Sequence, residues 1–332
     1  LIFFGTYLFN IHSVFTLLIS VTPVFSVVTV VYYFFIWLFR RNRLSRMLLI
    51  TVLIMASVKY FDHWISWCPS VPESSTTIRV LTWNIERAGA LKEPEQSPHN
   101  IALAVRLLDS VNPDIAVIQE VSKNQLQSLA NQLNVSPNNY QWTSYYGRSH
   151  GGLGILLLNG AEWSLSLKKS QNLPPAWKCL FAELKNRHEK RINILGIHIA
   201  PPKITTQNVS NITSVQELKN VLRTYTKQVS KQNLQLEKIN SLIQRFKDPT
   251  ILAGDFNSTA ELPIHAQLRG YLKDAWLEAG FGLGATRYWA DVLPFRIDYI
   301  YFTDEFKINK TKVLPRLFSD HNPLLSETFL LE

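Results

Sequence analysis

The N-terminal segment limits the architecture of this 332-residue chain most, because its first 39 residues contain no Asp, Glu, Lys or Arg. As a single helix these residues would be about 58 Å long at about 1.5 Å per residue, whereas the hydrocarbon core of a bilayer is about 30 Å thick. Polar residues and a proline interrupt the apolar run at residues 20–23. The segment therefore predicts two membrane spans rather than one.

A third apolar stretch, residues 47–67, follows four arginines within residues 40–46. Short arginine-rich loops stay on the cytoplasmic side of a membrane. Three apolar stretches around one basic loop argue against a cleaved signal peptide and against a buried core. We therefore expect a transmembrane anchor over residues 1–67, of two or three spans. Its basic loop, residues 40–46, would be cytoplasmic, and the rest of the chain would lie on the opposite side.

Residues 68–77 contain two prolines among polar residues, which is typical of a linker. Residues 78–332 are numerous enough to form one domain with a full core. The domain keeps about +6 of the chain's net charge of +9, and this mild excess fits a phosphate-bearing substrate or an anionic membrane surface. The two cysteines, Cys68 and Cys179, exclude a disulfide-rich scaffold. Their spacing leaves open whether they pair.

Short apolar runs alternate with helical patterns along the domain. Helical spacing of apolar residues predicts helices at residues 101–110 and 215–246. Apolar runs predict strands at residues 78–83, 114–118, 154–158, 192–199, 251–253 and 297–302. Such a mixture in one unit indicates a layered α/β domain.

Most predicted strands end in a carboxylate, an amide or an imidazole. A single Asp or Asn at such a position is usually explained by turn geometry. Two histidines and several carboxylates at successive strand ends are better explained by convergence on one edge of a sheet. The residues are Asn84, Glu86, Glu120, His198, Asp255, Asn257 and Asp298, followed near the C-terminus by Asp320 and His321.

These residue types suit the hydrolysis of a phosphoester. Carboxylates hold Mg²⁺ or Mn²⁺ with waters still bound, and such a cation neutralises phosphate oxygens. A neutral imidazole accepts a proton from water, and a protonated one donates to the leaving group. The sequence has neither a Cys-x-x-Cys nor a His-Glu-x-x-His pattern, so it gives no support to a zinc site of those kinds.

Five short motifs follow one another along the domain: Thr82-Trp83-Asn84, Gln119-Glu120, Gly254-Asp255-Phe256-Asn257, Arg296-Ile297-Asp298-Tyr299 and Ser319-Asp320-His321-Asn322-Pro323. In these motifs and in their order the chain resembles the endonuclease/exonuclease/phosphatase superfamily, the deoxyribonuclease-I-like group. The resemblance covers residues 78–332 and implies a four-layered α/β/β/α sandwich that hydrolyses phosphoesters with Mg²⁺ or Mn²⁺. The chain also resembles bacterial membrane members, some linked to glycopeptide resistance. That likeness implies a bacterial cytoplasmic membrane protein whose catalytic domain faces the periplasm or the outside.

The resemblance implies a metal site on four of these residues. Glu120 would be the principal ligand, with Asn84 beside it. Glu86 falls where some members place a second metal-binding acid. Asp320 would complete the metal site or act on water.

The same resemblance implies five catalytic residues. Asp255 and Asn257 would orient the attacking water and the phosphate, with Asp255 as a candidate base. His321 would lie against the scissile phosphate, held in its tautomer by Asp298. His198 matches the branch that uses two histidines, in which it would be the general acid.

Three functions remain open from the sequence. The first is a phosphodiesterase or phosphatase that acts on an envelope or lipid-linked substrate near the bilayer. The second is an endonuclease or exonuclease acting on DNA or RNA, for which residues 286–289 could supply base stacking. The third is a non-catalytic binding domain, which would not need the complete set of polar residues. Arg148 and Arg287 are weaker candidates for phosphate contacts, and no obligate protein partner is indicated.

Overall fold

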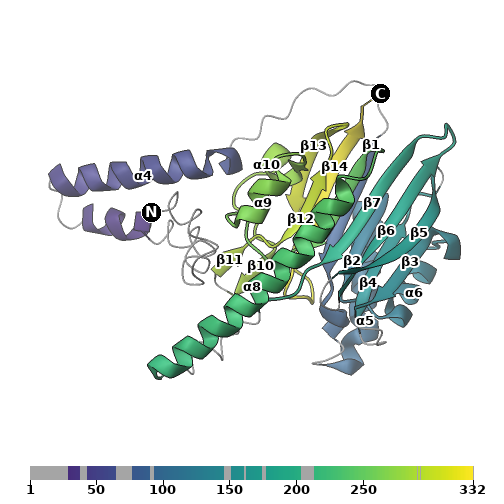
Figure 1. Ribbon diagram of the computed structural model, residues 1–332, viewed down its shortest axis with the longest axis horizontal. Coiled ribbons are helices and arrows are strands. Elements are labelled where there is room, and N and C mark those ends of the chain that lie inside the picture. The colour runs from purple at the N-terminus through teal and green to yellow at the C-terminus, as the bar shows by residue number, and fades with distance from the viewer. Residues whose placement is uncertain are drawn as a thin grey trace.

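Two six-stranded sheets form the centre of the domain (Figure 1). The computed structural model describes residues 29–37, 43–64, 77–89, 93–145, 151–160, 162–173, 177–202, 213–289, 291 and 293–331. The first sheet has the order β13-β14-β1-β2-β4-β3. Its strands are β1 (Thr77–Asn84), β2 (Ile115–Gln119), β3 (Tyr140–Ser144), β4 (Gly152–Leu157), β13 (Phe306–Val313) and β14 (Leu324–Leu330).

The second sheet has the order β5-β6-β7-β8-β12-β9. Its strands are β5 (Trp163–Leu173), β6 (Trp177–Asn186), β7 (Arg191–His198), β8 (Thr250–Asp255), β9 (Lys273–Asp274) and β12 (Asp298–Phe302). A separate hairpin joins β10 (Arg287–Trp289) to β11 (Leu293–Phe295). In both sheets one pair of neighbouring strands is parallel, β1 with β2 and β7 with β8.

Helices cover the outer face of each sheet. Against the first sheet lie α5 (Ser97–Val111) and α6 (Lys123–Gln132), and with the second lie α8 (Val215–Ile243) and α9 (Pro263–Leu268). The short α10 (Ala275–Ala279) packs between β13 of the first sheet and β12 of the second. The short 3₁₀ helices are η1 (Glu86–Gly89), η2 (Pro94–Gln96) and η3 (Pro137–Asn139). The layers are thus α/β/β/α, and the predicted sandwich is confirmed for the domain.

Alternation along β1 shows how the sequence builds these layers. Ile78 and Val80 face the second sheet and join the large core between the sheets. Leu81 and Trp83 point the other way and pack with α5 and α6. Successive side chains on a strand point to opposite faces, so one strand supplies both cores.

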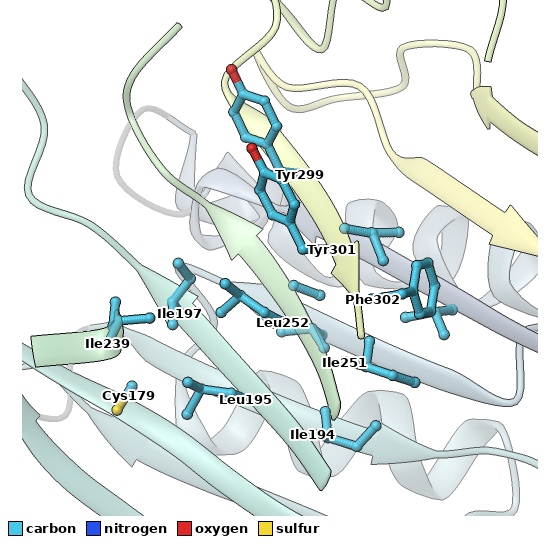
Figure 2. Packing of buried hydrophobic residues seen from close by; sticks show 14 of the residues in the cluster. Cys179, Ile194, Leu195, Ile197, Ile239, Ile251, Leu252, Tyr299, Tyr301 and Phe302 are labelled. Atoms are coloured by element: carbon cyan, nitrogen blue, oxygen red, sulfur yellow. The ribbon is translucent and has the colours of Figure 1, made fainter. Parts of the chain in front are cut away.

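The large core continues through the second sheet to its helical layer. Leu195 and Ile197 of β7 belong to one buried cluster with Ile239 of α8 and Leu252 of β8. Figure 2 shows these side chains gathered around the β7–β8 pair. Because both faces of this sheet are covered, its central strands are apolar runs without alternation. The same cluster buries Cys179, which is a free thiol, whereas Cys68 lies outside the described residues.

The predicted elements of the domain correspond to observed ones within a few residues. The two predicted helices are α5 and α8, and the six predicted strands are β1, β2, β4, β7, β8 and β12. Capping boxes fix two helix starts: Ser122 with Gln125 begins α6, and Ser214 with Glu217 begins α8. The strands β5 and β6 carry many charged or polar residues, so their hydrophobic signal is weak.

The predicted anchor lies mostly where the structure gives no description. Residues 29–37 form a helix, and α4 (Arg43–Trp64) begins four residues before the predicted third stretch, so Arg43 and Arg46 are helical rather than in a loop. Among the described residues, no helix combines the length and the apolar character needed to cross a membrane. The first predicted span, the first part of the arginine loop and most of the linker lie outside the described residues.

Gly254 allows the closest backbone approach within the second sheet. Its φ is +155°, and a Cβ added there would lie 2.0 Å from the carbonyl oxygen of Ile197 on the parallel strand β7. Real Cβ atoms do not approach backbone so closely, so only glycine fits between the two strands at this point. The approach matters because the next residue of each strand, His198 and Asp255, forms the next register pair.

Gly254→Ala is expected to lower the free energy of unfolding by about 4 kcal/mol or more, because the added methyl forces β7 and β8 apart. Gly282→Ala is the matched control. Gly282 also has a positive φ, +81°, but nothing lies within 4 Å of its added Cβ. The control should lose only about 1–2 kcal/mol. Urea unfolding followed by circular dichroism measures both, and equal losses in the two variants would contradict the packing argument.

Candidate active site

The candidate site lies where strand ends of the two sheets meet. In the first sheet, β1 ends at Asn84 and β2 at Gln119, which are register partners, so Glu120 follows directly beside Asn84. In the second sheet, the register of β8 places Asp255 between His198 of β7 and Asp298 of β12. The carboxyl ends of parallel strands lie at one edge of a sheet, so each sheet presents its polar residues to the other.

His321 is placed by the first sheet although it lies far from β1 in sequence. Strand β14 pairs antiparallel with β1, and Leu324 faces Thr82. The residues just before β14 therefore lie beside the end of β1. Trp83 Nε1 donates to the His321 carbonyl oxygen at 3.1 Å, and Ser319 Oγ donates to the Asn84 carbonyl oxygen at 2.6 Å.

Asp255 is the centre of the cluster. Asn84 Nδ2 donates to its Oδ2 at 3.0 Å, and His198 Nε2 lies 3.4 Å and His321 Nε2 3.8 Å from the same oxygen. The Asn257 backbone N–H donates to its Oδ1 at 2.8 Å. The carboxylate is buried. Burial raises the pKa of Asp255, although the neighbouring histidines oppose the shift.

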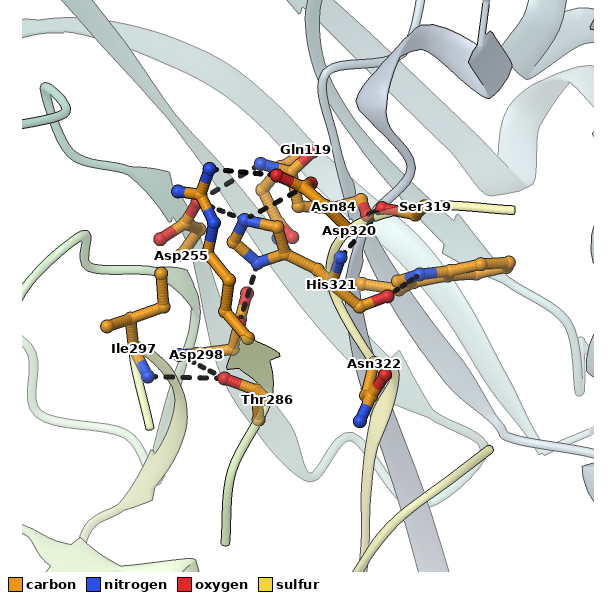
Figure 3. Close-up of polar contacts among 12 residues, drawn as sticks. Asn84, Gln119, Asp255, Thr286, Ile297, Asp298, Ser319, Asp320, His321 and Asn322 are labelled. Carbon is orange, nitrogen blue, oxygen red and sulfur yellow. Dashed lines mark hydrogen bonds and ion pairs between the residues drawn. The ribbon is translucent and has the colours of Figure 1, made fainter. Parts of the chain in front are cut away.

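His321 joins the two sheets. Its Nδ1 lies 2.9 Å from Asp298 Oδ2, and Figure 3 shows the imidazole between Asp298 and Asp255. Asp298 is oriented in turn by its backbone N–H, which donates to Thr286 Oγ1 at 3.1 Å. Burial acts to lower the pKa of His321, but the attraction of Asp298 and Asp255 outweighs it and raises the pKa to about 9. At neutral pH this imidazole is positively charged.

His198 lies in a different environment, between aromatic rings. Tyr145 and Trp177 contact it edge-on, with ring centroids 5.0 and 5.1 Å away. Burial lowers the pKa of His198 to about 4, despite the opposing effect of Asp255. Its Nδ1 is buried and has no hydrogen-bond partner among the described residues. This imidazole is neutral at neutral pH.

The four predicted metal residues are not equally placed. Glu120 accepts from Asn84 Nδ2 at 3.3 Å through Oε1, and its side chain is partly exposed. Asp320 Oδ1 lies 3.8 Å from His321 Nε2, while its Oδ2 pairs with Arg287 Nη2 at 2.8 Å. Glu86 is tied to the cluster by its backbone N–H, which donates to Asn84 Oδ1 at 3.0 Å.

The remaining predicted residue, Asn257, is buried beside Asp255. Its Nδ2 donates to the Ile199 carbonyl oxygen at 2.9 Å and to Asp255 Oδ2 at 3.2 Å. Asn257 therefore connects the loop after β8, where it lies, to the loop after β7. Eight of the nine predicted residues form one connected side-chain cluster, namely Asn84, Glu120, His198, Asp255, Asn257, Asp298, Asp320 and His321, whereas Glu86 joins it only through its backbone N–H. The catalytic and metal-binding roles assigned to them stay predictions.

A divalent cation fits the chemistry of this cluster. The carboxylates of Asp255, Asp298 and Asp320 are assembled against the cations Arg287 and His321, and the carboxylate of Glu120 lies 4.0 Å from His198 Nε2. The Oδ1 of Asp298 is buried and accepts no hydrogen bond from the described residues. Ligand atoms of Asp255, Asp298 and His321 lie within 4.8 Å of one another. A protonated imidazole does not bind a metal ion, so the partly exposed Glu120 offers the better primary ligand.

Sequence reasoning missed the residues that support the site. Tyr145 accepts a hydrogen bond from the Glu120 backbone N–H at 2.9 Å, and Trp177 packs on His198. Both come from the ends of β3 and β6, where isolated aromatic residues give no catalytic signal. Arg287, one of the two weaker candidates, pairs with Asp320 at the site. Arg148, the other, lies outside the described residues.

Comparison with known proteins gives the family. Residues 81–321 match the model of the Endonuclease/Exonuclease/phosphatase family. This chain belongs to that family, whose members are hydrolases that act on phosphoester bonds. No curated protein sequence matches the chain.

Solved structures agree in fold. An endonuclease/exonuclease/phosphatase from Bacteroides vulgatus is 16% identical, with a TM-score of 0.58, and the match covers 77% of this chain and 99% of that one. A mannosyl-6-phosphatase from Bacteroides thetaiotaomicron is 16% identical with a TM-score of 0.53, covering 76% and 100%. TDP2 from Caenorhabditis elegans is 16% identical with a TM-score of 0.54, covering 77% of each chain. At this identity the likeness concerns the fold alone.

The charged state of His321 predicts how stability depends on pH in metal-free protein. The folded-state pKa of about 9 exceeds the ordinary value of 6.5. The proton on His321 therefore stabilises the fold fully below about pH 6.5, and this contribution disappears as pH rises through about 9. When the pH rises from about 6 to about 10, the free energy of unfolding should fall in both proteins. The fall should be about 3 kcal/mol smaller in His321→Gln than in the parent protein, because the variant has no imidazole to lose its proton. Urea unfolding in the presence of a chelator measures this, and parallel pH curves would contradict it.

Proposed function

We propose that this chain is a divalent-metal-dependent phosphoesterase whose catalytic centre is the cluster around Asp255. The observation that carries the proposal is the convergence of two differently charged histidines on one buried carboxylate. His198 is neutral and His321 is charged, and both face Asp255 Oδ2. Opposite pKa shifts around one reacting centre are characteristic of acid–base catalysis.

Glu120 would hold the cation, with Asn84 and Asp320 beside it, because carboxylate and amide oxygens suit Mg²⁺ or Mn²⁺. When bound there, such a cation would neutralise charge on the phosphoryl oxygens and would lower the pKa of a water. Arg287 fixes Asp320 at this edge through their 2.8 Å ion pair. The positive charge of Arg287 also suits the approach of a phosphate group.

Asp255 is the proposed base. Its raised pKa makes the carboxylate a stronger proton acceptor than an exposed aspartate. The Asn257 N–H holds Oδ1, which leaves Oδ2 turned toward the cluster. In the reaction, Asp255 takes a proton from the attacking water, the water oxygen bonds to phosphorus, and the bond from phosphorus to the leaving oxygen breaks.

His321 is the proposed proton donor to the leaving oxygen. The charged imidazole also attracts the phosphoryl oxygens, and Asp298 holds its Nδ1 so that Nε2 faces the cluster. His198, with its pKa lowered to about 4, is neutral and is not the acid in this scheme. This assignment transfers the role of general acid from His198, where the family resemblance puts it, to His321.

The expected result is metal-dependent hydrolysis that falls by about 10²–10⁴-fold in His321→Ala, because general acid catalysis contributes about that much. The full-length chain is assayed with Mg²⁺ in parallel on bis-p-nitrophenyl phosphate, plasmid DNA and a polyprenyl pyrophosphate. His188→Ala is the control, since His188 is exposed in the turn after β6. Hydrolysis of plasmid DNA alone would select a nuclease. Metal binding without hydrolysis of any substrate, in an otherwise folded protein, would favour a binding domain.

Removal of the metal gives a second test. Chelation should abolish activity, and Mg²⁺ or Mn²⁺ should restore it. Glu120→Gln should raise the Mg²⁺ concentration for half-maximal activity by at least about tenfold, because one carboxylate charge is lost from the site. Glu95→Gln, in the exposed η2 segment, is the control. Full activity of the chelated protein would exclude the metal-dependent mechanism.

We also propose that residues 1–67 hold the chain at a bacterial cytoplasmic membrane, with the domain on the outer side. The uncharged residues 1–39 and the arginines of residues 40–46 support this. Apolar side chains are exposed on the helix of residues 29–37 and along α4. A substrate in the envelope or linked to lipid would then be within reach. A reporter fused after Trp67 should be active outside the cytoplasm, and activity only inside would reject this topology.

A further inference from the structure

Helix α8 extends beyond the body of the domain on the side of the candidate active site. It connects the parallel strands β7 and β8, so its N-terminal end lies near the edge where those strands end, at His198 and Asp255. Its 29 residues make a helix about 43 Å long at about 1.5 Å per residue. Figure 1 shows one end of α8 projecting away from both sheets.

The projecting end is apolar on one side. Val215 is 71% exposed and Leu218 43% exposed, although both lie on the helix face that is buried farther along at Val229 and Leu236. None of residues 215–224 is buried. The stripe that attaches α8 to the sheet therefore continues into solvent for almost three turns.

The projecting end and the turns that follow it also carry a row of positive charge. Lys219, Arg223, Lys227 and Lys231 repeat every four residues, so they line one side of the helix. Between residues 215 and 236 the only acid is Glu217, and its carboxylate accepts hydrogen bonds from Thr213 and Ser214 at the N-cap. The positive row is thus not neutralised along its own helix.

We propose that the projecting end of α8 docks on an anionic lipid bilayer. Exposed aliphatic side chains beside a row of Lys and Arg form the pattern of a helix that lies in the membrane interface. The apolar side chains enter the acyl boundary, and the cations pair with anionic headgroups. Nucleic acid would use the cations but would leave Val215 and Leu218 in water, and base stacking would need aromatic side chains, which residues 215–224 lack.

The docking helix is linked directly to the candidate active site. Gln232 Nε2 donates to the carbonyl oxygens of Ala200 and Asn257, at 2.8 and 3.0 Å. Gln235 Oε1 accepts from the Ala200 N–H at 2.9 Å. The loop after β7 and the loop after β8 are thus both tied to the buried part of α8. Docking of the projecting end would hold the site at the bilayer surface, where a phosphoester of a membrane lipid is presented.

The test uses the full-length chain with a fluorophore sensitive to polarity attached at Leu218→Cys in a Cys68→Ser background, because Cys179 is buried. Emission should shift to the blue and rise when vesicles of equal parts phosphatidylglycerol and phosphatidylcholine are added. Vesicles of phosphatidylcholine alone should cause no such change. This signal reports the environment of α8 itself and is independent of hydrolysis and of attachment through residues 1–67.

Lys219→Gln with Arg223→Gln should weaken the vesicle-induced signal, raising the lipid concentration for half-maximal change about 25-fold, or about fivefold per cation. Glutamine is as good a helix former as lysine or arginine, so α8 stays helical. The matched control is Lys190→Gln with Lys312→Gln, two exposed lysines outside α8, which should change it less than about twofold.

Several results would overturn the proposal. An unchanged signal on anionic vesicles would exclude docking, and equal signals on both vesicle types would exclude recognition of charge. A blue-shifted emission without lipid would mean that another segment of the chain, or a second copy, covers the surface. A response to duplex DNA but not to vesicles would assign the surface to nucleic acid.

Discussion

The ion pair between His321 and Asp298 is the contact on which the candidate site depends. Asp298 begins β12 in one sheet, and His321 precedes β14 in the other. Both side chains are buried, and removing one partner of a buried pair costs about 3–5 kcal/mol because the other charge is left without compensation. The imidazole stays charged only if the two sheets are close enough for Asp298 to reach His321. Packing of the core between the sheets fixes this spacing and therefore also the charge of the imidazole.

Asp255 shows what this arrangement costs the fold. Its carboxylate is buried at the end of β8, and burial raises its pKa even though Asn84, Asn257 and two histidines surround it. A folded protein without catalytic demands would place an apolar residue there at lower cost. Such a group is retained where its reactivity is used. The electrostatic cost and the proposed role as base thus have the same physical origin.

Much of the fold and of the site was predictable because the sequence patterns that indicate them, apolar runs and the polar residues at their ends, are local. Buried strands such as β7 and β8 are continuous apolar runs, and their ends are marked by His198 and Asp255. Strand β5 gave little signal because seven of its eleven residues are polar or charged. The opposite charge states of His198 and His321 could not be predicted, since they depend on contacts across the two sheets. Tyr145 and Trp177 around His198, and Asp298 against His321, come from distant parts of the chain.

Helix α8 illustrates how one sequence pattern can serve two purposes at different places. Its apolar stripe has a single helical period, but only the part from Tyr225 onward is buried against the domain. An isolated segment of about ten residues would be marginal as a helix, because nucleation is unfavourable. Here the buried part of α8 provides the nucleus from which the helix extends, and the Ser214–Glu217 capping box satisfies backbone N–H groups at the N-terminal end. The projecting end can therefore stay helical without a packing partner. Its apolar stripe and its row of cations then keep a fixed position relative to the loops that follow His198 and Asp255.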